Sequence, residues 1–414
     1  MALQRFGKCC RLLLQEPCKG GFLGSLQPGW IESCLGAKRH LLSEDIIKLQ
    51  DFQQRKLAVA HLVKGSNGNY FELFSQKLQR NELILRDELK LLLHLCQTAD
   101  DVMIARDAIY RYHAENRNLL YGEFKFGPLF MRLCYELGLE ETAAATITDK
   151  DMKGFFNDAT SFNITIDMLF TKGSYENALE VLRTMRLQGV AFNKDTLILA
   201  TGTCYKMNTV ESFKICTALI EEKQAKGHFI PRHAFCFAVA LALRQGDIRK
   251  AQSLYSQILS TDSRLCQNLK VIISLLSGEI TDATSILSAA MLTKSPPFVK
   301  KPEFSQEVVD LLRLQSEGQP HMMKAEQIVT QLERAGQVTQ QTLDDMLCRT
   351  PMRKMKLAPV LEERRTSRRT LRPLQSTLLS DLCCRRSVEL CHCEPFKHCC
   401  WSVDGVECLC ALLV

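Results

Sequence analysis

The chain has 414 residues, of which 46% are hydrophobic and 24% are charged, and its formal net charge is +7. This composition is ordinary for a folded protein, and the length suits a large core or an extended solenoid. We find no run of eighteen apolar residues, so we expect no membrane span. Strand-like alternation is scarce and prolines are few, which predicts an all-helical protein.

Residues 1–40 are rich in bases and poor in acids, with leucines among the early bases. The bases are Arg5, Lys8, Arg11, Lys19, Lys38 and Arg39, and the acids are Glu16 and Glu32. This pattern is typical of a mitochondrial transit peptide, whereas a secretory signal needs a longer unbroken apolar segment. A disordered or folded basic N-terminus is the alternative.

Residues 43–97 are expected to form three helices that make an N-terminal cap and a first hairpin. Ser43 followed by two acids favours a helix start. The glycines of residues 65–68 predict a loop, Tyr70 and Phe71 lie near the start of a second helix, and a third helix covers residues 83–95.

The stretch 159–193 predicts two amphipathic helices, because its apolar residues recur at helical spacing. They are Phe162, Ile166, Leu169 and Phe170 in the first helix, and Tyr175, Ala178, Leu182 and Met185 in the second. Gly173 is suited to end the first helix, Ser174 to cap the second, and Gly189 to end it. A single hairpin buries too little apolar surface to be stable, so we expect it to repeat.

A glycine followed five positions later by an alanine recurs along the chain and supports this expectation. The pairs are Gly138/Ala143, Gly173/Ala178, Gly246/Ala251 and Gly278/Ala283, with Asn208/Phe213 and Met103/Ala108 at related positions. The glycine allows a tight turn and the alanine allows close helix packing. The predicted fold is an α-solenoid of antiparallel helical hairpins over residues 41–298, clearest in units 124–158, 159–193, 194–231 and 232–266.

Three further regions follow the array. Ser295-Pro296-Pro297 marks a boundary, and residues 299–348 are interpreted as a helical cap with turns at Gly318 and Gly336. Two more degenerate repeats are the alternative for this region. Residues 349–382 are rich in arginine and are expected to form a basic flexible arm. Residues 383–414 hold eight cysteines whose spacing does not fit a zinc site, so we expect a disordered tail.

The central unit, SFNITIDMLFTKGSYENALEVLRTMRLQGVAFN, resembles a pentatricopeptide repeat in its aromatic-asparagine start, its glycine turn, its Glu-Asn-Ala segment and its Met-to-Gly close. The resemblance implies that the fifth and last residues of each unit contact one unstacked RNA base. Asn163 and Asn193 occupy these positions, and such a pair tends to favour a pyrimidine. Other units depart from the pattern, with Pro128 and Asp158, Ile198, or Cys236 and Cys266 at these positions.

Lys172, Lys206 and Arg244 lie near the ends of first helices and are candidates for contacts with the RNA backbone. A solvated helix end is the alternative interpretation of each. Most of the positive charge lies at the two ends of the chain, which leaves the repeats close to neutral. Because phosphate binding needs clustered Lys and Arg, composition alone is a weak argument for RNA.

Walker, G-x-S-x-G and H-E-x-x-H motifs are absent from the sequence, and we predict neither catalytic residues nor a metal or other cofactor. The resemblance implies a non-catalytic protein of the mitochondrial matrix that binds single-stranded RNA. Its expected role is RNA maturation or stability in support of respiratory-chain expression, with RNA-processing proteins as further partners. The alternative is a mitochondrial scaffold that binds other proteins.

Overall fold

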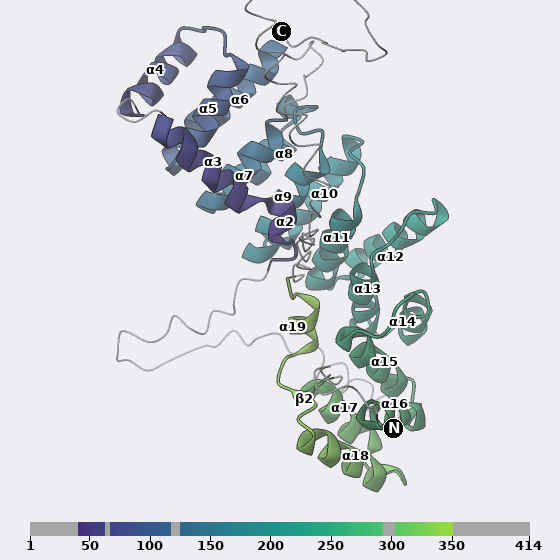
Figure 1. The fold of residues 1–414 in the computed structure, drawn as a ribbon. Coiled ribbons are helices and arrows are strands. Elements are labelled where there is room, and N and C mark those ends of the chain that lie inside the picture. The colour runs from purple at the N-terminus through teal and green to yellow at the C-terminus, as the bar shows by residue number, and fades with distance from the viewer. Residues whose placement is uncertain (1–39, 63–66, 117–124, 293–302, 351–414) are drawn as a thin grey trace, which may run out of the picture. The chain divides into compact units, whose positions relative to one another are not determined.

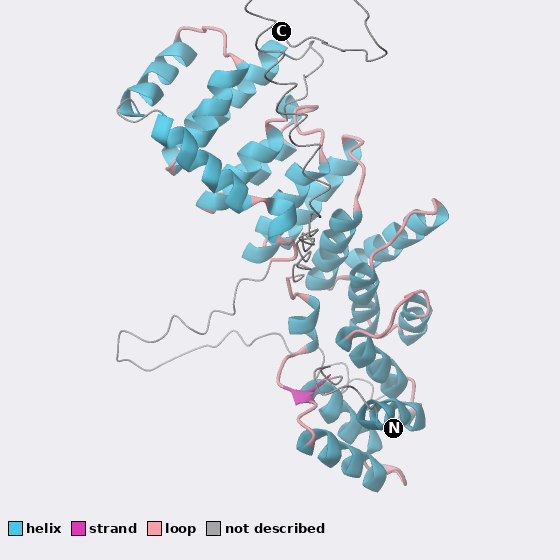
Figure 2. Ribbon diagram, viewed as in Figure 1, coloured by secondary structure: helices cyan, strands magenta, loops and turns pink. Residues whose placement is uncertain are grey.

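The computed structural model describes residues 40–62, 67–116, 125–292 and 303–350. Helices dominate this part of the chain (Figure 2), which confirms the predicted all-α repeat class. Residues 1–39, the boundary at 295–297, the arm beyond Thr350 and the tail 383–414 lie outside the described residues. The transit peptide, the flexible arm and the disordered tail therefore stay predictions.

The N-terminal half consists of short helices joined by turns (Figure 1). The elements are α2 (Glu44–Ile47), α3 (Leu49–Leu62), α4 (Asn67–Gln79), α5 (Arg86–Leu95), α6 (Ala99–Asn116), α7 (Gly127–Leu137), α8 (Glu140–Thr148) and the 3₁₀ turn η1 (Lys150–Met152).

The remaining elements continue this pattern, with a short parallel strand pair near the end of the described chain. They are α9 (Ala159–Lys172), α10 (Tyr175–Leu187), α11 (Lys194–Met207), α12 (Val210–Ala225), α13 (Arg232–Arg244), α14 (Ile248–Tyr255), α15 (Arg264–Leu276), α16 (Ile280–Leu292), β1 (Phe304–Ser305), α17 (Gln306–Ser316), α18 (Met322–Arg334), β2 (Val338–Thr339) and α19 (Leu343–Leu347).

From α5 onward the helices form hairpins whose partners are next in line. We call α5, α7, α9, α11, α13, α15 and α17 the first helices, and α6, α8, α10, α12, α14, α16 and α18 the second helices. Each first helix packs against the next first helix and against its own second helix (Figure 1). The last hairpin, α17–α18, packs in the same way, with α17 on α15 and α18 on α16. Residues 306–334 therefore extend the stack by one further hairpin.

The glycine–alanine pattern has the predicted physical basis. Gly173 ends α9 with φ of 88°, a left-handed conformation that costs little without a Cβ atom. Asn208 replaces glycine between α11 and α12 and also adopts a left-handed conformation, with φ of 49°. The alanines that follow the four glycines, Ala143, Ala178, Ala251 and Ala283, are fully buried.

Three local predictions were wrong in detail. Met103 lies inside α6 with no turn at its position, because this hairpin turns earlier, at residues 96–98. Ser43 and Ser174 do precede α2 and α10, but neither side chain accepts a capping hydrogen bond. The turn before α10 is instead fixed by the backbone, since the N–H of Ser174 donates to the carbonyl of Leu169 over 2.9 Å.

Residues 43–62 do not form part of a hairpin. Helix α3 packs across the first helices α5 and α7, and α2 packs on α9 (Figure 1). Phe52 of α3 is buried against α5, with its ring centre 5.7 Å from that of His94. The Lys56 ammonium forms an ion pair with Glu136 of α7. The N-terminal segment therefore lies along the layer of first helices.

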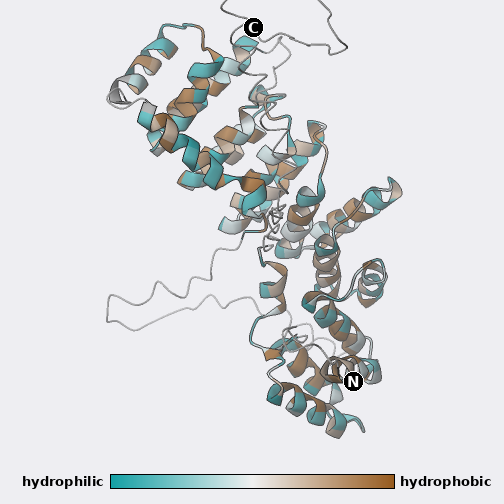
Figure 3. Cartoon of the chain, in the orientation of Figure 1, coloured by the Kyte–Doolittle hydropathy of each residue, from teal (hydrophilic) through white to brown (hydrophobic). Residues whose placement is uncertain are grey.

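Apolar side chains from successive helices form one continuous core. Many of the helices carry both hydrophobic and hydrophilic stretches (Figure 3), as expected when one face of a helix is buried. None of the helices in the described ranges has the length and apolar character needed to cross a membrane.

Candidate nucleic-acid interface

The predicted base-contact residues Asn163 and Asn193 lie side by side. Asn163 is the fifth residue of α9, and Asn193 is the N-cap of the next first helix, α11. The amide nitrogen of Asn163 donates to the Asn193 side-chain oxygen over 3.2 Å. The two positions that the pentatricopeptide resemblance implies therefore meet in the fold.

The environments of these two amides differ. Asn163 is fully buried, and its oxygen accepts a hydrogen bond of 2.8 Å from the Thr196 hydroxyl. Asn193 is exposed, and its oxygen also accepts from the backbone N–H groups of Asp195 and Thr196. In this arrangement Asn163 ties α9 to the start of α11 and orients Asn193, which is the amide that a ligand can reach. Base contact by the pair stays a prediction.

An equivalent asparagine, not predicted from the sequence, lies in α15. Asn268 is the fifth residue of α15, fully buried, and its oxygen accepts from the backbone N–H of Ser305 over 2.8 Å. Ser305 is the N-cap of α17. Asn163 and Asn268 therefore make the same link, from the fifth residue of one first helix to the N-cap of the next. Asn268 lies ten residues before Gly278, as Asn163 lies ten before Gly173, so the glycine register could have identified it.

The register between α13 and α15 requires a correction. Cys236 and Cys266 were paired by assuming a unit of 35 residues. Their sulfur atoms do meet, 3.7 Å apart. However, Cys266 is the third residue of α15, and the N-cap that corresponds to Asn193 is Ser263. The cause is the short second helix α14, and the 32-residue interval between Gly246 and Gly278 was the sequence signal for it.

All three predicted backbone-contact residues form ion pairs within the protein. Lys172 pairs with Glu140 of the preceding hairpin at 2.7 Å, with the lysine side chain 58% exposed. Because an exposed pair of this kind is weak, Lys172 remains available to a ligand. Lys206 and Arg244 differ, since both are mostly buried and both approach the carboxylate of Asp344 in α19.

The Asp344 carboxylate lies between two first helices. Its oxygens are 2.7 and 2.9 Å from Lys206 Nζ on α11 and 3.8 Å from Arg244 on α13. The Arg244 guanidinium also lies over the buried Tyr205 ring, 4.0 Å from its centre. Burial alone would lower the pKa of Lys206, but the nearby acidic groups of Cys348 and Asp344 outweigh it and raise the pKa. Lys206 is thus firmly cationic.

Further contacts fix α19 on the first helices. The Leu347 carbonyl oxygen lies 2.6 Å from Nε2 of His233, near the start of α13. Leu347 and Cys348 are buried. Arg264 of α15 hydrogen-bonds the side chain of Gln341, just before α19. We call residues 341–350 the C-terminal strap.

The N-terminal segment covers the neighbouring part of the same layer. The buried carboxylate of Asp167 in α9 accepts hydrogen bonds from the backbone N–H groups of Leu41 and Leu42, at 2.7 and 3.1 Å. Leu41 packs on Gly202 of α11, where an added Cβ would lie 2.9 Å from its methyl carbon. Glycine therefore provides the space for Leu41 at this position.

The two covering segments meet. The Thr350 hydroxyl donates to the His40 carbonyl oxygen over 2.6 Å. Together, residues 40–62 and the C-terminal strap contact the first helices from α5 to α15. The surface expected to hold RNA is thus covered in part by the protein's own chain, which the sequence analysis did not foresee.

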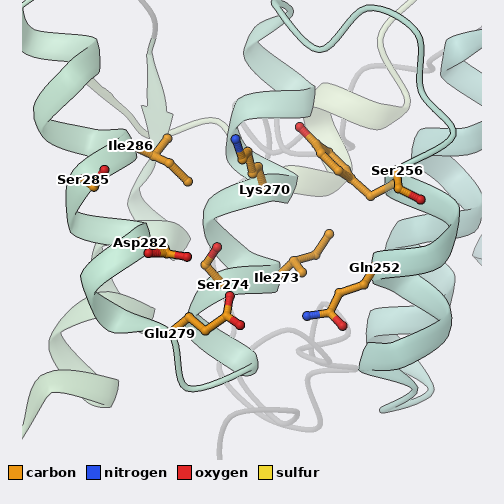
Figure 4. Close-up of a pocket in the computed structure, with 10 residues that line it drawn as sticks. Gln252, Ser256, Lys270, Ile273, Ser274, Glu279, Asp282, Ser285 and Ile286 are labelled. Atoms are coloured by element: carbon orange, nitrogen blue, oxygen red, sulfur yellow. The ribbon is translucent and has the colours of Figure 1, made fainter.

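A hollow of about 370 Å³ lies on a different part of the stack, among α14, α15 and α16 (Figure 4). Lys270, Glu279 and Asp282 are among its lining residues. None of the predicted interface residues lines it. Its mixed charges do not favour a polyanion.

Comparison with known proteins defines the class of this repeat protein. Residues 21–345 match the model of the family described as mitochondrial 28S ribosomal protein S27, and the chain belongs to that family.

Individual relatives are more specific. The chain is 52% identical to pentatricopeptide repeat-containing protein 2, mitochondrial, of Danio rerio, over 92% of this chain and all of the relative. It is 49% identical to the protein of that name from Xenopus laevis, over 83% of this chain and 90% of the relative. For the Homo sapiens protein the identity is 48%, over 84% and 90% of the two chains. The relatives' names confirm the resemblance to the pentatricopeptide repeat family, and all three are named mitochondrial.

Proposed function

We propose that the protein binds single-stranded RNA in the mitochondrial matrix and acts without catalysis in RNA maturation or stability, in support of respiratory-chain expression. The observation that carries this proposal is the stack of hairpins in register, with Asn163 and Asn193 meeting between α9 and α11. The family match to a mitochondrial ribosomal protein supports an association with RNA. RNA-processing proteins are proposed as further partners.

In this proposal Asn193 contacts the base and Asn163 positions it. Asn193 is exposed, and its amide nitrogen can donate to a base, while its oxygen already accepts from Asn163 and from the backbone N–H groups of Asp195 and Thr196. Lys172, at the other end of α9, then contacts a phosphate, because its side chain is 58% exposed in the pair with Glu140. The fifth residues of α9, α11 and α13 are Asn163, Ile198 and Cys236, so one of the three carries an amide. We therefore expect RNA binding with weak sequence preference and an affinity that depends strongly on salt.

A protein-binding scaffold is the second candidate, and one observation favours it. The first helices already bind polypeptide, since residues 40–62 and the C-terminal strap lie on them. A partner segment could bind the same layer with similar contacts. Such a partner would be insensitive to the Asn193 amide.

Crosslinking of RNA to the protein in intact mitochondria, followed by recovery of the protein, separates the two candidates. Asn193→Ser removes the amide but keeps a side chain suited to the N-cap. We expect reduced RNA recovery with Asn193→Ser and with Lys172→Ala. Lys250→Ala is the matched control, because Lys250 forms a similar pair with Glu221 on the second helices, at 2.6 Å. Equal recovery from all variants and the wild type would contradict base and phosphate contact at this site.

A further inference from the structure

Two neighbouring first helices present cations to the C-terminal strap. Lys206 on α11 and Arg244 on α13 both approach Asp344. Arg264 on α15 also hydrogen-bonds the strap, at Gln341, but its guanidinium already forms an ion pair with Glu303, outside the strap. Lys206 and Arg244 therefore form the row of cations that the near-neutral composition of the repeats did not reveal.

The strap complements this row by charge. Asp344 presents two oxygens to Lys206 at hydrogen-bond distance. Lys and Arg bind a carboxylate and a phosphate through the same charge-assisted hydrogen bonds. Asp344 therefore occupies the place that a phosphate oxygen would take if RNA followed the first helices.

The strap is held in place, but it is short enough for a ligand to displace it. Its helix, α19, has 5 residues, and a helix this short is not stable without its tertiary contacts. Its buried apolar side chains are four, Leu343, Met346, Leu347 and Cys348. The first helices beneath it also pack on one another and on their own second helices.

We propose that Lys206 of α11 and Arg244 of α13 form a phosphate-binding surface that the C-terminal strap occupies in the free protein, and that single-stranded RNA binds there by displacing the strap. This inference rests on the proposed function. It adds that RNA and Asp344 compete for Lys206 and Arg244, so the strap lowers the apparent affinity of the full chain.

Binding of a fluorescent single-stranded RNA oligonucleotide to the full chain at low salt tests the competition. Asp344→Asn removes the competing charge with little change of shape, and we expect its affinity to rise about fivefold or more. Glu326→Gln is the matched control. It changes the net charge equally and breaks a carboxylate–arginine pair with Arg313 on α17 and α18, away from the row. Leu347→Ala loosens the strap without a charge change and should also tighten binding.

Cys348 reports directly on the strap. Its thiol is buried on the first helices, so iodoacetamide should modify it slowly in the free protein and faster once RNA binds. Mass spectrometry of the modified peptides gives both rates. Cys216, fully buried in α12, is the internal control and should stay protected.

The outcomes separate the two proposals. RNA binding with equal affinity in the wild type, Asp344→Asn and Leu347→Ala, with Cys348 still protected, would overturn displacement and leave RNA binding intact. Failure of every folded variant to bind RNA would overturn both. Tighter binding by Asp344→Asn but not by Glu326→Gln, together with exposure of Cys348 by RNA, would support the strap as a competitor.

Discussion

Two junctions between successive hairpins differ in the side chain at the fifth residue of the first helix. We call them the polar step, from α9 to α11, and the α13 step, from α13 to α15. Between α9 and α11, the fifth residue is Asn163, and its amide bonds Asn193 and Thr196. Between α13 and α15, the fifth residue is Cys236, whose thiol meets Cys266. Both side chains are buried. At both junctions the fifth residue therefore joins successive hairpins. Only Asn163, which is polar, also positions an exposed side chain, that of Asn193.

The largest expected effect comes from removing the polar link. Asn163→Ala leaves a small cavity and removes two hydrogen bonds, those of the buried Asn163 amide with Asn193 and Thr196, so we expect a loss of about 3 kcal/mol in the free energy of unfolding. Cys236→Ala at the matched position should cost about 1 kcal/mol. Urea denaturation followed by circular dichroism measures both. Equal losses would show that the amide bonds contribute no more than packing.

The second largest expected effect concerns Leu41 of the N-terminal segment, which packs on α11. Gly202→Val places methyl groups where Leu41 and Phe237 already lie, within 3.3 Å of the new Cβ, and should cost about 2 kcal/mol. Leu41→Ala should relieve part of this cost in the double variant, because the two side chains share one space. Additive losses in denaturation experiments would show that Leu41 does not occupy this position in solution.

The N-cap at the polar step gives a smaller effect. Asn193→Ala removes the acceptor for the backbone N–H of Thr196 and should cost about 1 kcal/mol. Asn193→Ser should retain most of the stability, because serine also caps helices well. Thermal denaturation compares the two. A loss with serine as large as that with alanine would mean that the link to Asn163, rather than the cap, is what matters.

The smallest effect is a pH dependence at the α13 step. Burial lowers the pKa of His233 below the usual value near 6.5, although its hydrogen bond to the Leu347 carbonyl opposes the shift. Below about pH 6.5 the unfolded chain therefore binds more protons than the folded chain, and stability falls as the pH falls.

Urea denaturation at about pH 7.5 and about pH 5.5 measures this difference. His233→Gln should reduce the loss of stability on acidification, whereas His61→Gln, an exposed histidine in α3, should not. An unchanged pH dependence in His233→Gln would place the responsible protons elsewhere. His94 is the next group to test, since burial also lowers its pKa.

Local signals in the sequence predicted the hairpins well. Gly173 and Asn208 end first helices because both tolerate a left-handed conformation, and Ala178 is buried where two helices approach closely. The same pattern failed at Met103, where no residue suited to a left-handed conformation interrupts the helix. It also misplaced Cys266, because a shortened second helix changes the register without changing the turn.

The candidate site could be predicted only in part. The resemblance to a pentatricopeptide repeat singled out Asn163 and Asn193, and their side chains do meet. The pairing of Lys206 and Arg244 with Asp344 could not be read from spacing. These residues lie far apart in sequence, and many acids could have neutralised them equally well.

The sequence by itself determined the class of fold and the register of the clearest hairpins. Each of these depends on periodicity and on backbone conformations that a few neighbouring residues impose. Only the tertiary structure decided that Leu41 packs on Gly202 and that α19 lies on α13 and α15. Such contacts join segments remote in the chain, and their free energy arises only after the hairpins have stacked into a surface that can receive them.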